Sequence, residues 1–140
     1  MVEVTVIGVE PPCVRCSLVV QRVYEQAGQA GIEVRVQKLD CRSPEAQALA
    51  RQGQREVGTA KDVARQGAVP VDWGQVGELL QREWSAELDQ ALQPCQDQAD
   101  QLKMWMTPVL IIAGRLKHHG SVPSAEQIRS WLMEARTAKY

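Results

Sequence analysis

Residues 2–16 read VEVTVIGVEPPCVRC, and this stretch decides the fold of the chain. The apolar residues from Val2 to Val9 predict a strand that becomes buried on both faces. A pair of prolines ends the strand. A helix is then predicted from about Cys13 to Ala27, because apolar positions recur there at spacings of three and four residues. The two cysteines of the Cys-Val-Arg-Cys motif therefore fall where a strand ends and a helix begins.

The position of Cys13 favours its thiolate form. Unpaired backbone N–H groups and the positive end of the helix dipole meet at a helix N-terminus, and Cys-x-x-Cys thiols there can have strongly lowered pKa values. Arg15 adds a positive charge that acts in the same direction. Cys16 lies one turn further on, within reach of Cys13 for a disulfide, and on the apolar stripe of the helix. We expect Cys13 to be the exposed, acidic thiol and Cys16 the buried one.

Further along the chain the pattern predicts a second strand over residues 32–39 and a turn over residues 40–44. Ser43 is a plausible N-cap and Pro44 the first residue of a helix that runs to about Arg51. Because a strand-helix-strand unit crosses over with a right hand, the two strands are expected to be parallel neighbours.

The middle of the chain is predicted to be mainly helical. Residues 53–66 are ambiguous, with short helical pieces. Asp72 can cap a long helix whose apolar stripe extends to Leu92, with Pro94 at or just beyond its end. A further helix, or a bent continuation, is predicted from Cys95 to about Trp105. The tryptophans of this segment fit a helix-packing stripe better than a platform for substrate.

The last third predicts a hairpin and a helix. Strands over residues 109–113 and 116–121 flank a Gly-Arg turn, and Ser124 with Gln127 forms a capping box before the final helix. His118 and His119 are expected at solvent-facing or edge positions on opposite faces of their strand. The whole pattern predicts an α/β fold with a four-stranded mixed sheet flanked by helices.

Several of these motifs together resemble the thioredoxin superfamily, in particular its small glutaredoxin-like and thioredoxin-like members. The residues that carry the resemblance are the first strand, the Pro-Pro-Cys-Val-Arg-Cys loop, Thr107-Pro108 before a strand, the Gly114 turn and the segment from Gly120 into the last helix. The resemblance implies one thioredoxin-like domain over residues 1–140, with its core in 1–52 and 104–140. Residues 53–103 would be a helical insertion before the cis-proline strand.

The resemblance also implies roles for individual residues. Cys13 and Cys16 would be catalytic, and Arg15 and Pro12 would activate them. Thr107, Met106 and Pro108 would bind substrate, with a cis peptide before Pro108 packed against the cysteine loop. That geometry would leave the backbone of Thr107 free to pair with an extended substrate segment. The insert is expected to dock near the active-site end of the sheet, where it could select partners.

The function expected from these features is thiol–disulfide oxidoreduction without a bound cofactor. A protein or small-molecule disulfide would be the substrate, and a dithiol reductant or reductase would recycle the enzyme. Two alternatives remain open: a soft-metal or metalloid carrier that uses the same cysteines, and a non-enzymatic protein that interacts through its helical insert. No second Cys-x-x-Cys or His-x-x-x-His pair exists to complete a zinc site, so no metal is predicted.

Cys41 and Cys95 leave three hypotheses open: free structural thiols, a second disulfide, or a relay that receives oxidation from the first pair. Free structural thiols are favoured, because a lone cysteine is commonly a small core residue. Cys41 follows the second strand at the same end of the sheet as Cys13, so it is held as the reserve accessory thiol. Bridging would need Cα atoms within about 7 Å, which spacing alone does not establish.

Composition narrows the class of protein. The chain has 140 residues with 44% hydrophobic and 24% charged side chains, enough for a real core. Sixteen basic and seventeen acidic residues give a formal charge of −1, with no long run of one sign, so nucleic-acid and membrane partners are not expected. No apolar run approaches the length of a membrane span, and the N-terminus lacks the pattern of a signal peptide. A cytoplasmic location is expected.

Overall fold

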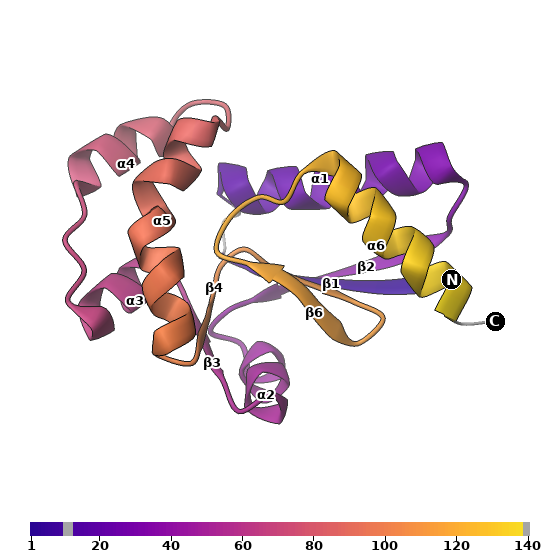
Figure 1. Ribbon diagram of the computed structural model, residues 1–140, viewed down its shortest axis with the longest axis horizontal. Coiled ribbons are helices and arrows are strands. Elements are labelled where there is room, and N and C mark those ends of the chain that lie inside the picture. Colours follow the sequence, from indigo (N-terminus) through magenta and orange to yellow (C-terminus); the bar gives the residue numbers. More distant parts are fainter. Residues whose placement is uncertain (10–12, 139–140) are drawn as a thin grey trace.

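The computed structural model describes residues 1–9 and 13–138, which form an α/β fold (Figure 1). In chain order the elements are β1 (Val2–Gly8), α1 (Val14–Ala30), β2 (Val34–Asp40), α2 (Pro44–Gln52), β3 (Glu56–Gly58), α3 (Ala60–Gly67), α4 (Trp73–Leu80), α5 (Ala86–Gln101), β4 (Met104–Met106), β5 (Val109–Ile112), β6 (Arg115–His119) and α6 (Ala125–Ala138). Among the described residues, no helix is both long enough and apolar enough to cross a membrane.

The main sheet has four strands in the order β2-β1-β5-β6. β1 runs parallel to β2, with Val2 opposite Val34, and antiparallel to β5, with Val4 opposite Ile112. β5 and β6 form the antiparallel hairpin. The predicted four-stranded mixed sheet is therefore confirmed, and its two central strands are β1 and β5.

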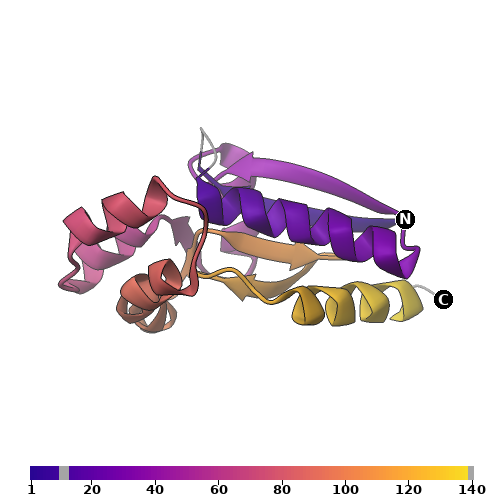
Figure 2. The same cartoon turned by 90° about the horizontal axis from the view of Figure 1, so that it is seen from above.

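Helices cover both faces of this sheet. α1 and α6 lie side by side on one face and α2 lies on the other (Figures 1 and 2). The larger core cluster joins β1 and β5 to α1 and α6 through buried aliphatic residues, among them Val4, Val19, Val23, Ile128 and Leu132. A second cluster, built around Ile7 and Trp105, fills the α2 side. Val4 and Ile7 differ by an odd number of residues, as expected for side chains on opposite faces of one strand.

The insert forms its own layer at one end of the sheet. α3, α4 and α5 pack together there, and the N-terminus and α6 extend toward the opposite end (Figure 2). A short parallel ladder of β3 and β4 closes the insert, with Glu56 opposite Met104 and Gly58 opposite Met106. The sequence pattern did not predict these two strands.

Local capping signals are confirmed. The Ser43 hydroxyl accepts a hydrogen bond from the Ala46 N–H, and Pro44 begins α2. Asp72 caps α4 through the Gln75 N–H. Ser124 and Gln127 exchange both hydrogen bonds of a capping box ahead of α6. Side chains that satisfy the first free N–H groups therefore set where these helices begin.

Three details of the helix predictions are wrong. The long helix expected from Asp72 to Leu92 is broken, because α4 ends at Leu80 and α5 begins at Ala86. Pro94 does not end a helix but lies inside α5, which continues to Gln101. Proline removes one backbone donor, and the packing of the residues around it outweighs that loss. Trp105, expected at a helix end, lies in β4.

Candidate dithiol site

Cys13 and Cys16 lie together at the start of α1. Cys13 is the N-cap residue, with extended backbone angles, and Cys16 belongs to the first turn. Their sulfur atoms are 3.4 Å apart, and both are free thiols. Cys13 is half-buried, whereas Cys16 is only 5% exposed. The predicted contrast in exposure between the two thiols is confirmed.

The two thiols have opposite pKa shifts. The pKa of Cys13 is lowered from 9.0 to about 6, mainly because the Cys16 side chain hydrogen-bonds to its sulfur. Burial opposes this change, and the backbone N–H groups of Cys16 and Arg15 assist it. The pKa of Cys16 is raised, first by the same hydrogen bond to Cys13 and then by burial. Cys13 is therefore the thiol that ionises near neutral pH, and Cys16 keeps its proton.

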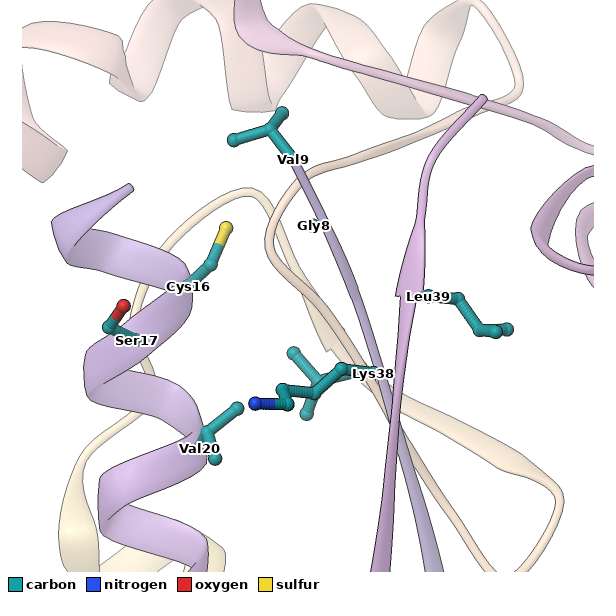
Figure 3. A pocket seen from close by; sticks show the side chains of 8 residues that line it. Gly8, Val9, Cys16, Ser17, Val20, Lys38 and Leu39 are labelled. Carbon is teal, nitrogen blue, oxygen red and sulfur yellow. The ribbon is translucent and has the colours of Figure 1, made fainter. Parts of the chain in front are cut away.

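A close approach between β1 and α1 makes room for the Cys16 sulfur. A Cβ added to Gly8 would lie 2.8 Å from Cys16 Sγ, closer than real Cβ contacts allow. On the same side a pocket of about 210 Å³ reaches this sulfur between α1, β1 and β2 (Figure 3). Its walls are mainly apolar and include Val6, Val9 and Val20. Gly8 is a residue of the site that the sequence analysis did not single out.

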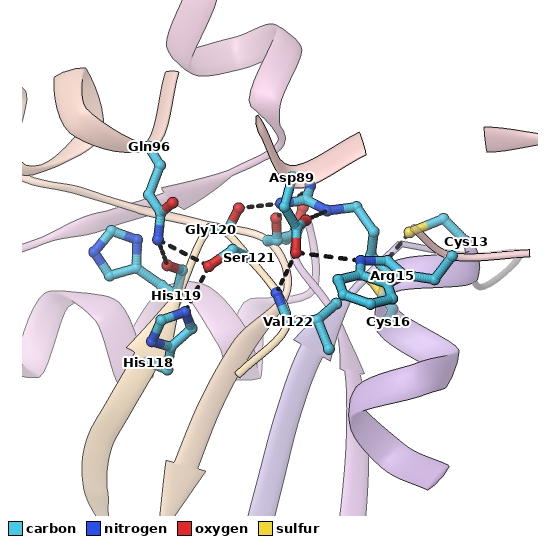
Figure 4. Close-up of polar contacts among 12 residues, drawn as sticks. Cys13, Arg15, Cys16, Asp89, Gln96, His118, His119, Gly120, Ser121 and Val122 are labelled. Atoms are coloured by element: carbon cyan, nitrogen blue, oxygen red, sulfur yellow. Dashed lines mark hydrogen bonds and ion pairs between the residues drawn. The ribbon is translucent and has the colours of Figure 1, made fainter. Parts of the chain in front are cut away.

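Arg15 helps to lower the pKa of Cys13, as predicted, but its side chain has a further role that was not predicted. Its side chain is buried and points away from the thiols, to Asp89 of α5 and to two backbone carbonyls (Figure 4). Nε donates to Asp89 Oδ1 at 2.8 Å, and the two terminal nitrogens donate to the carbonyl oxygens of Thr107 and Gly120. Its charge is the last and smallest of the causes that lower the pKa of Cys13. Arg15 is therefore chiefly a positioning residue that ties α1 to the insert and to two loops.

The peptide bond between Thr107 and Pro108 is cis, as predicted. The expectation that the Thr107 backbone is free for substrate is wrong. Its N–H donates to the carbonyl of Gly58 at 3.0 Å, and its carbonyl accepts from Arg15 at 3.4 Å. Thr107 is only 5% exposed. The insert strand β3 thus occupies the edge along which a substrate strand was expected to pair.

Met106 is also more enclosed than expected. It is fully buried in a cluster with Cys95, Val63 and Ala99, so its side chain packs in the core and does not line an open groove. Pro12, the other residue expected to activate the thiols, lies outside the described residues.

The insert docks beside the dithiol, as predicted. Val14, which lies between Cys13 and Arg15 in the chain, packs against a buried cluster of α4 and α5 that includes Leu79, Leu88 and Leu92. Asp89 adds the polar part of the contact, because its carboxylate accepts from Arg15, from the Trp84 indole and from the Val122 N–H. The sequence analysis did not single out Asp89, because its partner Arg15 is 74 residues away in the chain and no local motif links them.

The other two cysteines are buried free thiols in separate clusters. Cys41 packs with Ala46, Ala50 and Trp105, and Cys95 packs beneath α3. Burial raises the pKa of both thiols. This arrangement agrees with the favoured structural hypothesis, and among the described residues no disulfide joins Cys41 to Cys13 or Cys16.

Neither histidine is simply exposed. His118 is half-buried, stacks on Trp131 and hydrogen-bonds to Ser121, while burial lowers its pKa. His119 accepts from the Met106 N–H through Nδ1 and contacts Asp100 through Nε2. Both histidines lie on the edge strand β6, as predicted, but neither side chain is fully exposed to solvent. Within the described residues no group of three or more His, Cys, Asp and Glu side chains is placed to hold a metal ion.

No protein-family model, curated protein or solved structure matches this chain. The functional argument therefore starts from the site itself: a half-buried acidic thiol at a helix N-terminus, with a protonated thiol 3.4 Å away.

Proposed function

We propose that this chain is a thiol–disulfide oxidoreductase with a thioredoxin-like fold. The observation that carries the proposal is the Cys13–Cys16 pair, in which one thiol ionises near pH 6 and the adjacent buried thiol remains protonated. The four-stranded mixed sheet, the cis peptide before Pro108 and the position of the pair at the start of α1 are additional support, because the sequence analysis expected all three of a thioredoxin-like fold.

In the proposed reaction the Cys13 thiolate attacks one sulfur of a substrate disulfide. The substrate S–S bond breaks, one substrate thiolate leaves, and a mixed disulfide forms on Cys13. Cys16 then loses its proton and attacks Cys13 Sγ, which releases the second substrate sulfur as a thiol. Two electrons pass to the substrate, and the enzyme is left with a Cys13–Cys16 disulfide. An external dithiol returns it to the reduced state, and no bound cofactor takes part.

The buried position of Cys16 suits this second step. In the reduced state its S–H group stabilises the Cys13 thiolate, which lowers the pKa of Cys13. Once Cys13 is in a mixed disulfide, that thiolate no longer exists, so the negative charge that raises the pKa of Cys16 is removed. The change makes Cys16 easier to deprotonate when it is needed as the attacking group.

The test is reduction of a chromogenic aromatic disulfide by the full chain, with Cys13→Ser and Cys16→Ser variants. Cys13→Ser should abolish the reaction, whereas Cys16→Ser should release one equivalent of aromatic thiol and stop as a mixed disulfide on Cys13, visible by mass spectrometry. The double variant Cys41→Ala and Cys95→Ala is the control and should keep turnover within about tenfold, or 1.4 kcal/mol of barrier. Full activity of Cys13→Ser would overturn the proposal.

A further inference from the structure

Four arginines line one small pocket on the α2 side of the molecule. Arg42 lies in the turn before α2, Arg51 in its last turn, Arg55 just before β3, and Arg65 in α3. The pocket has a volume of about 190 Å³. None of the four arginines belongs to the dithiol site, and neither the sequence motifs nor the proposed function gives them a role.

A buried carboxylate orients two of these arginines. Asp62, whose side chain is 8% exposed, forms ion pairs with Arg42 at 3.0 Å and with Arg65 at 2.7 Å. It also accepts the Thr59 N–H in the capping box of α3. Burial alone would raise the pKa of Asp62, but these hydrogen bonds, with Thr59 first, hold it below the ordinary value. Asp62 thus stays ionised and places two guanidinium groups at the pocket rim.

The other two arginines are not neutralised. The Arg55 side chain donates to the backbone carbonyl of Gln54, and the Arg51 side chain makes no hydrogen bond or ion pair with the described residues. The pocket lining therefore has four positive charges against two negative ones, from Asp62 and Glu56, on a chain whose net charge is −1. This local excess of two positive charges matches a dianion.

We propose that this pocket binds a small molecule through one phosphate group. Phosphate carries about −1.5 to −2 charge at pH 7 and presents three acceptor oxygens, so it can accept forked hydrogen bonds from more than one guanidinium group at once. A single carboxylate carries only one negative charge, so it would leave half of the local positive excess uncompensated. The concave shape and limited volume favour a small ligand over a protein segment. The site is independent of the thiol chemistry.

The test is a titration of the full chain with inorganic phosphate at constant ionic strength. Binding is followed by calorimetry and by NMR of the arginine Nε–H groups. We expect saturable binding, with the largest shifts at Arg51 and Arg55. The double variant Arg51→Gln and Arg55→Gln should weaken binding at least about tenfold, which corresponds to 1.4 kcal/mol. It leaves the Asp62 contacts intact, so the fold should be retained.

Matched controls separate a built site from general charge attraction. Arg82→Gln and Arg129→Gln remove the same charge at exposed positions outside the pocket and should change affinity less than about twofold. Replacing Arg51 and Arg55 by lysine keeps the positive charge but removes the paired N–H donors of the guanidinium groups, so it should also weaken binding. Equal losses in the control pair, full affinity in the lysine variant, or binding that does not saturate would each overturn the proposal. Malonate binding as tight as phosphate would overturn the choice of ligand.

Discussion

Replacing Asp89 by Ala should show how strongly the insert is attached to the dithiol helix. The carboxylate accepts from Arg15 at 2.8 Å, from the Val122 N–H at 3.0 Å and from the Trp84 indole at 3.2 Å. The Arg15 side chain is 5% exposed, so the variant leaves a buried cation without its counter-ion. Breaking a buried pair in this way costs about 3–5 kcal/mol. Arg15 keeps its two carbonyl contacts, so the expected loss is about 3 kcal/mol.

The assay is urea and thermal unfolding of the reduced protein. A loss of about 3 kcal/mol should lower Tm by about 10 °C for a chain of this size. Asp97→Ala is the matched control, because the Asp97 side chain lies on the same helix but, among the described residues, pairs only with the exposed Gln93 side chain. The control should lose less than about 0.5 kcal/mol. A loss below about 1 kcal/mol for Asp89→Ala would refute the argument, because Arg15 would then be hydrated when unpaired.

Three further predictions concern the helices and thiols of the core. Gly8→Ala should lower the free energy of unfolding by about 1–3 kcal/mol and slow disulfide reduction, because the new Cβ would lie 2.8 Å from Cys16 Sγ. Gly28→Ala is the control: its new Cβ would have no atom within 4 Å, so the variant should stabilise the protein by about 0.5–1 kcal/mol. Equal effects of the two variants in urea unfolding would contradict the packing argument. Alkylation of Cys13 should rise with a midpoint near pH 6, and Cys16→Ala should move that midpoint upward. Because the folded pKa of Cys13 is below its ordinary 9.0, the reduced protein should gain stability over Cys13→Ser as pH rises from about 6 to 9, while Cys16 stays protonated; a flat difference would contradict the shift. Pro94→Ala should stabilise the protein by up to about 3 kcal/mol, because it restores a backbone donor inside α5. A urea midpoint below that of the original protein would contradict this prediction and show that the packing of Cys95 depends on the proline.

The parts of the fold that the sequence predicted are those encoded by neighbouring residues. Apolar spacing located β1 and α1, and short capping motifs located the starts of α2, α4 and α6. The burial of Cys16 followed from its place on the apolar stripe of its own helix. Each of these features depends on contacts within a few residues, or on one face being covered by something apolar.

The failures arise where distant segments decide the structure. β3 and β4 have three residues each, too few for a periodic pattern, and they exist because they pair with one another. The stripe Leu80, Trp84, Leu88 keeps its spacing of four across the break between α4 and α5. Leu80 is in fact 39% exposed, but its apolar side chain continued the pattern, so the spacing gave no sign of the break. The resemblance correctly placed the cis peptide at Pro108 but gave no sign that β3 would take the adjacent backbone edge.

The β3–β4 ladder also bears on the order in which the chain can assemble. β1 pairs with β5, with Val4 opposite Ile112, and the whole insert lies between these two residues in the chain. The entropy cost of closing a loop rises with the logarithm of its length, by about 0.6 kcal/mol for each doubling. Pairing Glu56 with Met104 joins the two ends of the insert and removes the residues between them from that loop. An insert that forms its ladder first therefore shortens the search of the central strand for its partner.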